Sequence, residues 1–231
     1  MDIKFSGVTK IFEPDIVALE DVYLNIDRGE FVYLVGETGS GKTTLMRCIF
    51  REVIPSRGHI SVGGRALRKM GRFELALFRR DIGVIFQDFS LLPNITAFEN
   101  VAFVLEVMGV PSREIEERVA DVLKTVGIWR RRNLYPPQLS GGEQQRLAIA
   151  RAIVNEPSLI LADEPTGNLD SHTADEIMQL MLDINAAGTT VIMATHNQAI
   201  VDTYRHRVVE IRRGRIVRDD KEGGYEADVT Y

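Results

Sequence analysis

Cysteine, basic charge and long apolar runs are all scarce in this sequence. Cys48 is the single cysteine among 231 residues, so no intrachain disulfide can form and we expect a reducing compartment. Lys and Arg number 28 against 33 Asp and Glu, and a net charge of −5 gives no reason to expect a nucleic-acid partner. The best apolar stretch, residues 101–110, is short and contains Glu106, so we expect no membrane insertion. Residues 1–4 have no secretory-signal character, and any membrane contact is therefore expected to go through a partner.

Short apolar runs alternate with helical patterns along most of the chain. This alternation predicts an α/β fold with a largely parallel sheet. Ile115, Val119 and Val122 fall on one face of an amphipathic helix that ends at Gly127. The expected core strands are residues 31–35, 82–86, 159–162, 190–194 and 208–211.

The domain organisation is predicted from where this alternation changes. Residues 3–5 and 17–26 are short strands with turns between them, which predicts an antiparallel β piece before Gly36. The sequence has no internal repeat and no Pro/Gly/Ser-rich linker, so we expect one domain. Its expected parts are a core of residues 1–88 and 156–220, a helical subdomain of residues 89–155, and a loosely ordered polar tail of residues 221–231.

A glycine-rich motif follows the first expected core strand. Residues 36–43, Gly-Glu-Thr-Gly-Ser-Gly-Lys-Thr, fit the pattern G-x-x-x-x-G-K-[ST] and precede a helical segment. Backbone N–H groups of such a loop converge on phosphate oxygens, Lys42 reaches the β and γ phosphates, and Thr43 offers a hydroxyl to Mg²⁺. The alternative is a glycine-rich turn with an incidental lysine. The strand before the motif and the helix after it favour the phosphate-binding loop.

Two carboxylates, Asp163 and Glu164, end the apolar run at residues 159–162. The run alone is explained by a buried central strand. Ligands of open α/β sheets bind at the carboxyl ends of the strands, which is where these two residues lie. We therefore expect Asp163 to hold Mg²⁺, and Glu164 to orient and deprotonate the attacking water.

The pentapeptide Leu-Ser-Gly-Gly-Glu at residues 139–143 opens an expected helix. Ser140 and Glu143 form a capping box, which is the purely structural explanation. Capping does not account for Gly141 and Gly142, because glycine is unfavourable in a first helical turn. Both suit a backbone that approaches an anion at a helix N-terminus.

In this order, the three motifs resemble those of the nucleotide-binding subunits of ATP-binding-cassette (ABC) ATPases, and the resemblance covers nearly the whole chain. It implies a P-loop (RecA-like) core with an N-terminal antiparallel β subdomain and an inserted helical signature subdomain. The commonest signature of that family ends in Gln, whereas Glu143 stands here. Because Glu caps a helix as well as Gln does, and the Ser and both Gly are intact, the resemblance still implies ATP hydrolysis.

The resemblance implies roles for further residues, each of which has a structural alternative. Gln87 looks like the Q-loop glutamine and His196 like the switch histidine, although such residues are usually solvated or structural. Phe12 resembles the aromatic residue that stacks on adenine, or it is a core residue. The implied catalytic residues are Glu164, His196 and Gln87, and the implied Mg²⁺ ligands are Thr43, Gln87 and Asp163. The implied ATP contacts are Phe12, Gly36, Glu37, Thr38, Gly39, Ser40, Gly41, Lys42, Thr43, Thr44, Ser140, Gly141, Gly142 and, in the D-loop, Asp170.

The resemblance also implies how two copies of the chain work together. Each ATP would be sandwiched between the phosphate-binding loop of one copy and the signature, residues 139–143, of the other. ATP would close this homodimer and ADP would open it. The movement would reach an integral-membrane partner through residues 88–93, where core packing is the alternative explanation for Phe89, Leu91 and Leu92.

Among ABC subgroups, residues 86–88, 96–102, 139–146 and 163–170 look most like those of the bacterial cell-division ATP-binding subunits. Their membrane partner, of the FtsX type, activates peptidoglycan hydrolases outside the cell, which implies a peripheral place on the cytoplasmic face of the membrane. One alternative is the ATPase of a transporter, such as a lipoprotein-release or efflux system. A soluble P-loop protein acting on DNA or ribosomes, and a non-hydrolysing binding module, are the alternatives outside this class. The run at residues 130–132, three arginines, is either a solvated loop or a contact for anionic lipid.

Overall fold

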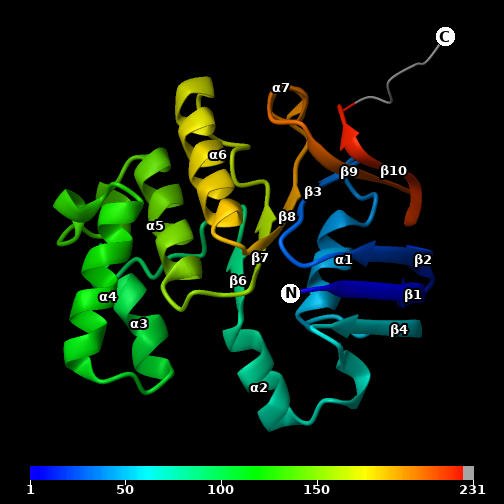
Figure 1. Cartoon of the computed structure of the whole chain (residues 1–231), viewed down its shortest axis with the longest axis horizontal. Coiled ribbons are helices and arrows are strands. Elements are labelled where there is room, and N and C mark those ends of the chain that lie inside the picture. The colour runs from blue at the N-terminus through cyan, green and yellow to red at the C-terminus, as the bar shows by residue number, and fades with distance from the viewer. Residues whose placement is uncertain (226–231) are drawn as a thin grey trace.

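The computed structural model describes residues 1–225 of the chain. Its core sheet is formed by strands β3 (Phe31–Val35), β6 (Ile82–Ile85), β7 (Leu159–Asp163), β8 (Thr190–Ala194), β9 (His206–Arg212) and β10 (Arg215–Gly223). The spatial order is β10-β9-β3-β8-β7-β6 (Figure 1). All pairs are parallel except β10 with β9 at one edge. The α/β core with a largely parallel sheet is therefore confirmed.

Helices cover both faces of this sheet. They are α1 (Lys42–Ile49), α2 (Arg72–Arg80), α3 (Ala97–Val107), α4 (Ser112–Thr125), α5 (Gly141–Ile153), α6 (Ser171–Ala186) and α7 (Gln198–Thr203). Residues 1–225 also contain three short 3₁₀ turns: η1 (Leu67–Lys69) between β5 and α2, and η2 (Trp129–Arg131) and η3 (Pro136–Gln138) between α4 and α5.

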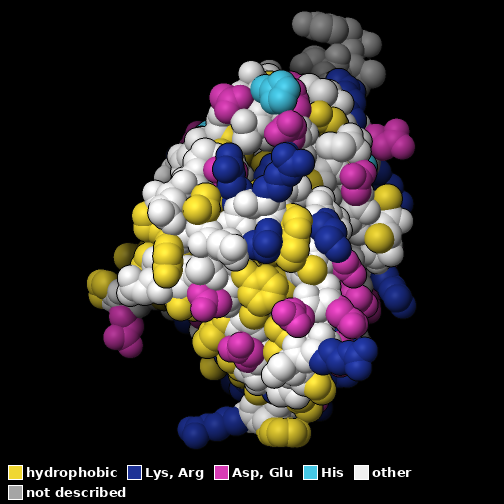
Figure 2. All heavy atoms as spheres, turned by 90° about the vertical axis from the view of Figure 1, so that its left-hand side faces the viewer, with side chains coloured by type: hydrophobic (Ala, Val, Ile, Leu, Met, Phe, Trp, Pro, Cys, Tyr) yellow, Lys and Arg dark blue, Asp and Glu magenta, His cyan; other side chains and the backbone are white. Residues whose placement is uncertain are grey.

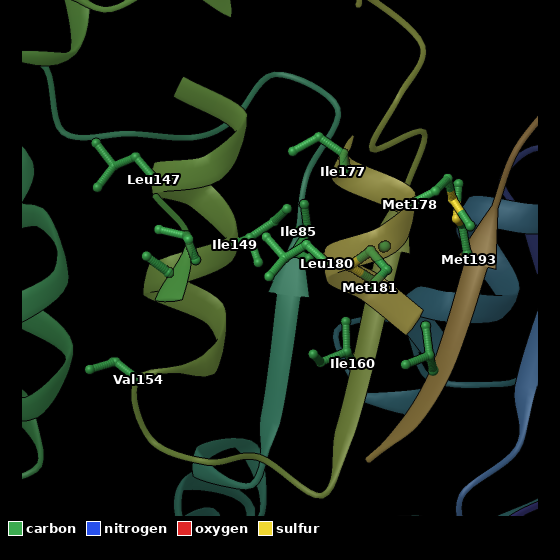
Figure 3. Close-up of a cluster of buried hydrophobic side chains, with 14 of the residues drawn as sticks. Ile85, Leu147, Ile149, Val154, Ile160, Ile177, Met178, Leu180, Met181 and Met193 are labelled. Carbon is green, nitrogen blue, oxygen red and sulfur yellow. The ribbon is translucent and has the colours of Figure 1, made fainter. Parts of the chain in front are cut away.

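Strand β3 is buried along its whole length because both faces of the sheet are covered. Tyr33 and Val35 belong to the apolar cluster that includes α5 and α6, whereas Val32 and Leu34 belong to the cluster that includes α1. Figure 3 shows the first cluster, with Ile149 of α5 beside side chains of α6 and of the strands. Continuous apolar runs, rather than alternating ones, are what such doubly covered parallel strands require.

The antiparallel subdomain is a second sheet in the order β2-β1-β4-β5. Its strands are β1 (Ile3–Phe12), β2 (Ile16–Ile26), β4 (Arg57–Val62) and β5 (Arg65–Ala66). The subdomain is therefore not built from residues before Gly36 alone, because β4 and β5 follow α1 in the chain. β1 is also longer than the expected strand at residues 3–5.

The segment between β6 and β7 holds α3, α4 and α5, which lie together on the left of the core sheet in Figure 1. Leu105, Val119, Leu123 and Leu147 are fully buried among these helices. The inserted helical subdomain is therefore confirmed as part of the fold.

The ordered part of the chain extends beyond residue 221, where the sequence predicts that a loosely ordered tail begins. β10 continues to Gly223, the N–H of Tyr225 donates to Asp202 Oδ1 at 2.8 Å, and Arg218 Nη1 donates to the carbonyl of Gly224 at 3.1 Å. These bonds fix residues 221–225, so the prediction is wrong there. The rest of the expected tail, residues 226–231, lies outside the described residues.

Candidate functional site

The loop of residues 36–43 joins β3 to α1 and requires glycine at two positions for steric reasons. Gly36 has φ 138°, and a Cβ there would lie 2.2 Å from the carbonyl oxygen of Ile211. Gly41 has φ 117°, and a Cβ there would lie 2.5 Å from the carbonyl oxygen of Ala18. Only glycine fits both places. The loop is therefore held close to β9 and β2, and it ends at the N-terminus of α1.

Two side chains of this loop are arranged for an anion. Lys42 is 9% exposed, and its Nζ donates to the carbonyls of Gly36 at 2.7 Å and Glu37 at 3.1 Å, so the ammonium folds back over the loop. Ser40 Oγ is buried and has no hydrogen-bond partner within the part of the chain that the structure describes. A buried hydroxyl without a partner is costly unless a ligand supplies one. Together with the free N-terminus of α1, these groups fit a phosphate chain.

Thr43 and Asp163 form an oxygen pair at the end of the loop. Thr43 Oγ1 donates to Asp163 Oδ2 at 2.9 Å, which connects the start of α1 to the carboxyl end of β7. Gln87 lies two residues beyond β6, which pairs with β7, and its side chain is exposed. Oxygen donors of this kind suit Mg²⁺, which takes few protein ligands and completes its shell with water and phosphate oxygens. The three residues expected to bind the metal therefore lie at or beside the carboxyl ends of the neighbouring strands β6 and β7.

Glu164 and His196 make direct contact at the carboxyl ends of β7 and β8. Glu164 Oε1 lies 2.8 Å from His196 Nδ1, and the N–H of His196 donates to Glu164 Oε2 at 3.3 Å. The Glu164 side chain is 10% exposed and that of His196 is 65% exposed. Glu164 also has φ 52°, a conformation that non-glycine residues rarely adopt and that is concentrated at functional sites. The pair thus holds a carboxylate and an imidazole in position for proton transfer or for polarising water.

A cavity of about 650 Å³ opens beside these groups. Its lining includes Gly36, Glu37, Thr38, His196 and Tyr225. The phosphate-binding loop and the histidine therefore share one space, large enough for a nucleotide's phosphate chain.

The signature at residues 139–143 forms the N-terminus of α5. Ser140 Oγ accepts from the N–H of Glu143 at 3.3 Å, and Glu143 Oε2 accepts from the N–H of Ser140 at 2.9 Å, as expected for a capping box. A Cβ on Gly142 would lie 2.6 Å from Thr173 Cγ2, whereas one on Gly141 would meet nothing closer than 3.9 Å. Gly142 thus has a structural reason in the packing of α5 on α6. Helix capping explains Ser140 and Glu143, and helix packing explains Gly142. Of these four signature residues, Gly141 alone has no structural explanation within the described chain.

The signature does not lie at the phosphate-binding loop of its own chain. In Figure 1, α5 and α1 stand on opposite sides of strands β6, β7 and β8. Ser140 makes its side-chain hydrogen bond within its own helix cap. Within one copy of the chain, residues 36–43 and residues 139–143 therefore lie apart from each other.

Two other expected ligand contacts have clear positions. Phe12 is 38% exposed at the end of β1, so the alternative that it is a core residue is wrong. Lys10 Nζ lies 4.7 Å from the centre of its ring. Asp170 is the N-cap of α6, and the hydroxyl and N–H of Thr173 lower the pKa of its carboxyl group. Asp170 therefore already has a capping role within one chain.

Two of the three arginines at residues 130–132 make contacts with other side chains of the same chain. Arg131 Nε lies 2.8 Å from Glu143 Oε1, and the guanidinium of Arg132 lies 4.3 Å from the ring centre of Trp129. Two of the three arginines therefore stabilise the helical subdomain, and only Arg130 is left to act as a solvated cation.

Sequence reasoning missed residues that β9 and the C-terminal segment bring to the site. Glu210 and Arg212 of β9, and Tyr225 beyond β10, line the cavity. Burial raises the pKa of the Tyr225 phenol, with a further contribution from the charges of Glu164 and Glu210, so the phenol stays protonated and can donate. No motif marks these positions, since it is the pairing of β9 with β3 and the bond of Tyr225 to Asp202 that bring them beside the loop.

Comparisons with known proteins agree with this geometry. The family model described as "ABC transporter" matches residues 19–167. The chain is 48% identical over 226 residues to the cell division ATP-binding protein FtsE of Streptococcus pneumoniae, with 98% of each chain covered. It is 41% identical to the methionine import ATP-binding protein MetN of Haemophilus influenzae, covering 96% of this chain and 65% of MetN.

Solved structures give the same result. The chain is 40% identical to MJ0796, described as a bacterial ABC transporter cassette in dimeric form, with a TM-score of 0.88 and coverage of 96% of this chain and 99% of that one. MJ0796 has also been solved as a dimer bound to ADP and Pi, with a TM-score of 0.87 at 39% identity. On this sequence, fold and site geometry, the chain belongs to the ABC family as an ATP-hydrolysing ABC ATPase and is similar over nearly its whole length to FtsE proteins.

Proposed function

We propose that the chain is the ATP-hydrolysing subunit of a cell-division complex, in which it drives conformational change in an FtsX-type membrane partner and so regulates peptidoglycan hydrolysis. The observation that carries this proposal is the 48% identity to FtsE over 98% of both chains. MetN, by contrast, extends well beyond the region that it shares with this chain. The ATPase of a transporter, such as a lipoprotein-release or efflux system, is the alternative, because the family model that matches the chain is described as "ABC transporter".

The chemistry proposed for the site follows from the positions of its side chains. Lys42 and the backbone N–H groups of the loop bind the β and γ phosphates, and Ser40 Oγ supplies a further donor. Glu164 Oε accepts a proton from the attacking water, while His196, in contact with Glu164, orients the reacting groups. Thr43, Asp163 and Gln87 would hold Mg²⁺, which when bound neutralises charge on the triphosphate.

The separation of the phosphate-binding loop from the signature supports a homodimer as the active form. Ser140 and Gly141 lie at the N-terminus of α5, and α5 and α1 stand on opposite sides of β6, β7 and β8 in Figure 1, so a second copy is the natural source of a signature for each ATP. The γ-phosphate would then favour the closed dimer, and its loss on hydrolysis would release the pair. The dimeric structures of MJ0796 support this reading by similarity.

A surface groove supports an integral-membrane partner. The partner groove, a hollow of about 400 Å³, is lined among others by Phe86, Leu92, Phe103, Val104 and Met108. Leu92 is 40% exposed and Phe103 is 47% exposed. Figure 2 views the molecule from the side on which α3, α4 and α5 lie in Figure 1, and it shows hydrophobic side chains near the middle of that side. Exposed apolar surface of this kind marks interaction sites.

A short segment, residues 88–92, connects Gln87 of the candidate site to the partner groove. Arg151 of α5 donates to the carbonyls of Phe89 and Ser90, which lie two and three residues after Gln87. Leu91 packs against the core, while Leu92 lines the groove. Of the three residues expected to dock the partner, Leu92 is therefore the best placed.

No helix in the described residues is long and apolar enough to cross a bilayer. With an integral-membrane partner in the groove, the chain is proposed to be peripheral on the cytoplasmic face of the membrane.

The proposal is tested by co-purification with an FtsX-type membrane protein from the source organism. Leu92→Glu should abolish co-purification while the soluble variant keeps the parental affinity for ATP. Depletion of the chain should block cell division. Normal division together with failure to export or import a defined solute would favour the transporter instead.

A further inference from the structure

The surface formed by η1 and α2 carries concentrated positive charge. Arg68, Lys69, Arg72 and Arg80 are exposed there, and Glu74 is the one carboxylate on these two elements. Within residues 1–225, no acidic side chain forms an ion pair with any of the four cations. Because the whole chain has a net charge of −5, this basic surface is not a consequence of overall composition.

Two large apolar side chains project from the same surface. Phe73 is 79% exposed and Leu77, one turn further along α2, is 44% exposed. Leu75 and Phe78, on the other side of the helix, pack into the core. The four cations with Phe73 and Leu77 are called the α2 surface below. An exposed aromatic residue framed by cations is typical of helices that lie on a membrane.

The α2 surface adjoins the partner groove. Arg79 and Arg80 line that groove together with Phe86 and Phe103. Helix α2 forms the lower end of the molecule in Figure 1, and basic and hydrophobic side chains project at the lower end in Figure 2. Because the partner groove is proposed to receive an integral-membrane protein, this end of the chain would face the bilayer.

We propose that the α2 surface binds anionic lipid headgroups directly, with Phe73 entering the headgroup region. Charge complementarity selects this occupant, since lipid phosphates attract Lys and Arg and the aromatic ring gains by leaving water. This is adsorption at the surface and adds to the contact made through a membrane partner. The orientation rests on the proposed function, but the binding itself requires no partner.

The test is co-sedimentation of the full chain with vesicles that contain no membrane protein. Vesicles of phosphatidylglycerol and phosphatidylcholine in equal parts should bind the chain, with affinity falling as salt rises, whereas phosphatidylcholine alone should not. Arg72→Ala should weaken binding about five-fold, and combining it with Arg68→Ala and Lys69→Ala on the order of 100-fold. Phe73→Ser should weaken binding about ten-fold at every salt concentration.

Arg130→Ala is the matched control, because Arg130 is an exposed cation on a different surface. It should bind vesicles like the parent, and all variants should keep parental ATP hydrolysis, which shows that they fold. Equal binding of the parent to both vesicles, or equal losses for Arg72→Ala and Arg130→Ala, would overturn the proposal. Binding of double-stranded DNA through the same residues, without vesicle binding, would also overturn it. Loss of partner co-purification with lipid binding intact would count against the proposed function alone.

Discussion

Arg131 and Glu143 form an ion pair that connects η2 to the signature, with Arg131 Nε 2.8 Å from Glu143 Oε1. The other carboxylate oxygen of Glu143 accepts the N–H of Ser140, the residue proposed to contact ATP across the dimer. The N–H of Ser140, and then the guanidinium of Arg131, lower the pKa of Glu143, so this carboxylate stays charged. Glu143 thus adds a negative charge where the partner's triphosphate would arrive, and Arg131 offsets it.

This arrangement predicts that Arg131 matters only because Glu143 is charged. Arg131→Ala should weaken ATP-driven dimerisation about two- to five-fold, since both side chains are partly exposed and such pairs contribute modestly. In a Glu143→Gln background the same change should have no effect, because the carboxylate is gone. Sedimentation in ATP of the two single variants and the double variant measures the coupling. Equal effects of Arg131→Ala in both backgrounds would remove the proposed role.

Much of the candidate site at the carboxyl ends of β3 and β7 could be predicted from the sequence, because the sequence patterns that mark it are local. The loop at residues 36–43 needs glycines at fixed spacing, and Asp163 and Glu164 directly follow an apolar strand. These features depend on a few neighbouring residues, so a linear motif contains them.

Features that depend on contacts far apart in the chain were not predictable. β4 and β5 join the antiparallel sheet after α1, and no local pattern marks them. Tyr225 reaches the cavity because Asp202 and Arg218 bond the backbone around it, although the polar sequence there predicts a loose tail. The requirement for Gly142 is set by Thr173 of another helix. The wrong boundary at residue 221 has the same cause.

Lys42 and Glu164 should separate nucleotide binding from hydrolysis. Lys42→Ala removes the ammonium that folds over the loop, so ATP affinity should fall by at least about 100-fold. Glu164→Gln keeps the loop intact and removes the candidate base, so ATP should still bind while phosphate release falls on the order of 1,000-fold. Equilibrium ATP binding and steady-state phosphate release check both variants. Parental turnover by Glu164→Gln would show that another group activates the water.

Ser140 should be required for dimerisation and dispensable for ATP binding. In a Glu164→Gln background, ATP should produce a dimer and ADP should not, because only ATP retains the γ-phosphate. Ser140→Arg should abolish that dimer, since the bulky cation occupies the expected contact across the interface. Analytical ultracentrifugation in each nucleotide measures this. The same sedimentation with and without Ser140→Arg would mean that the signature does not act between copies.

Gly142 and Gly141 should respond differently to the same substitution, although they are neighbours in the signature. Gly142→Ala places a methyl group 2.6 Å from Thr173 Cγ2, so α5 and α6 must separate and the free energy of unfolding should fall by about 1–3 kcal/mol. In Gly141→Ala the new methyl group would meet nothing closer than Leu169 Cδ2 at 3.9 Å, so the free energy of unfolding should change by less than about 0.5 kcal/mol.

The Gly142 effect can be tied to its cause by a second substitution. Thr173→Ser removes Cγ2 but keeps the hydroxyl that donates to Asp170 Oδ2 at 2.7 Å, so it should restore most of the stability lost in Gly142→Ala. Urea unfolding of the three single variants and the Gly142→Ala, Thr173→Ser double variant provides the measurement. If Thr173→Ser gives no rescue, the close approach of α5 and α6 is not what requires glycine at position 142. Contact of the Gly142 backbone with ATP would then be the remaining explanation for this glycine.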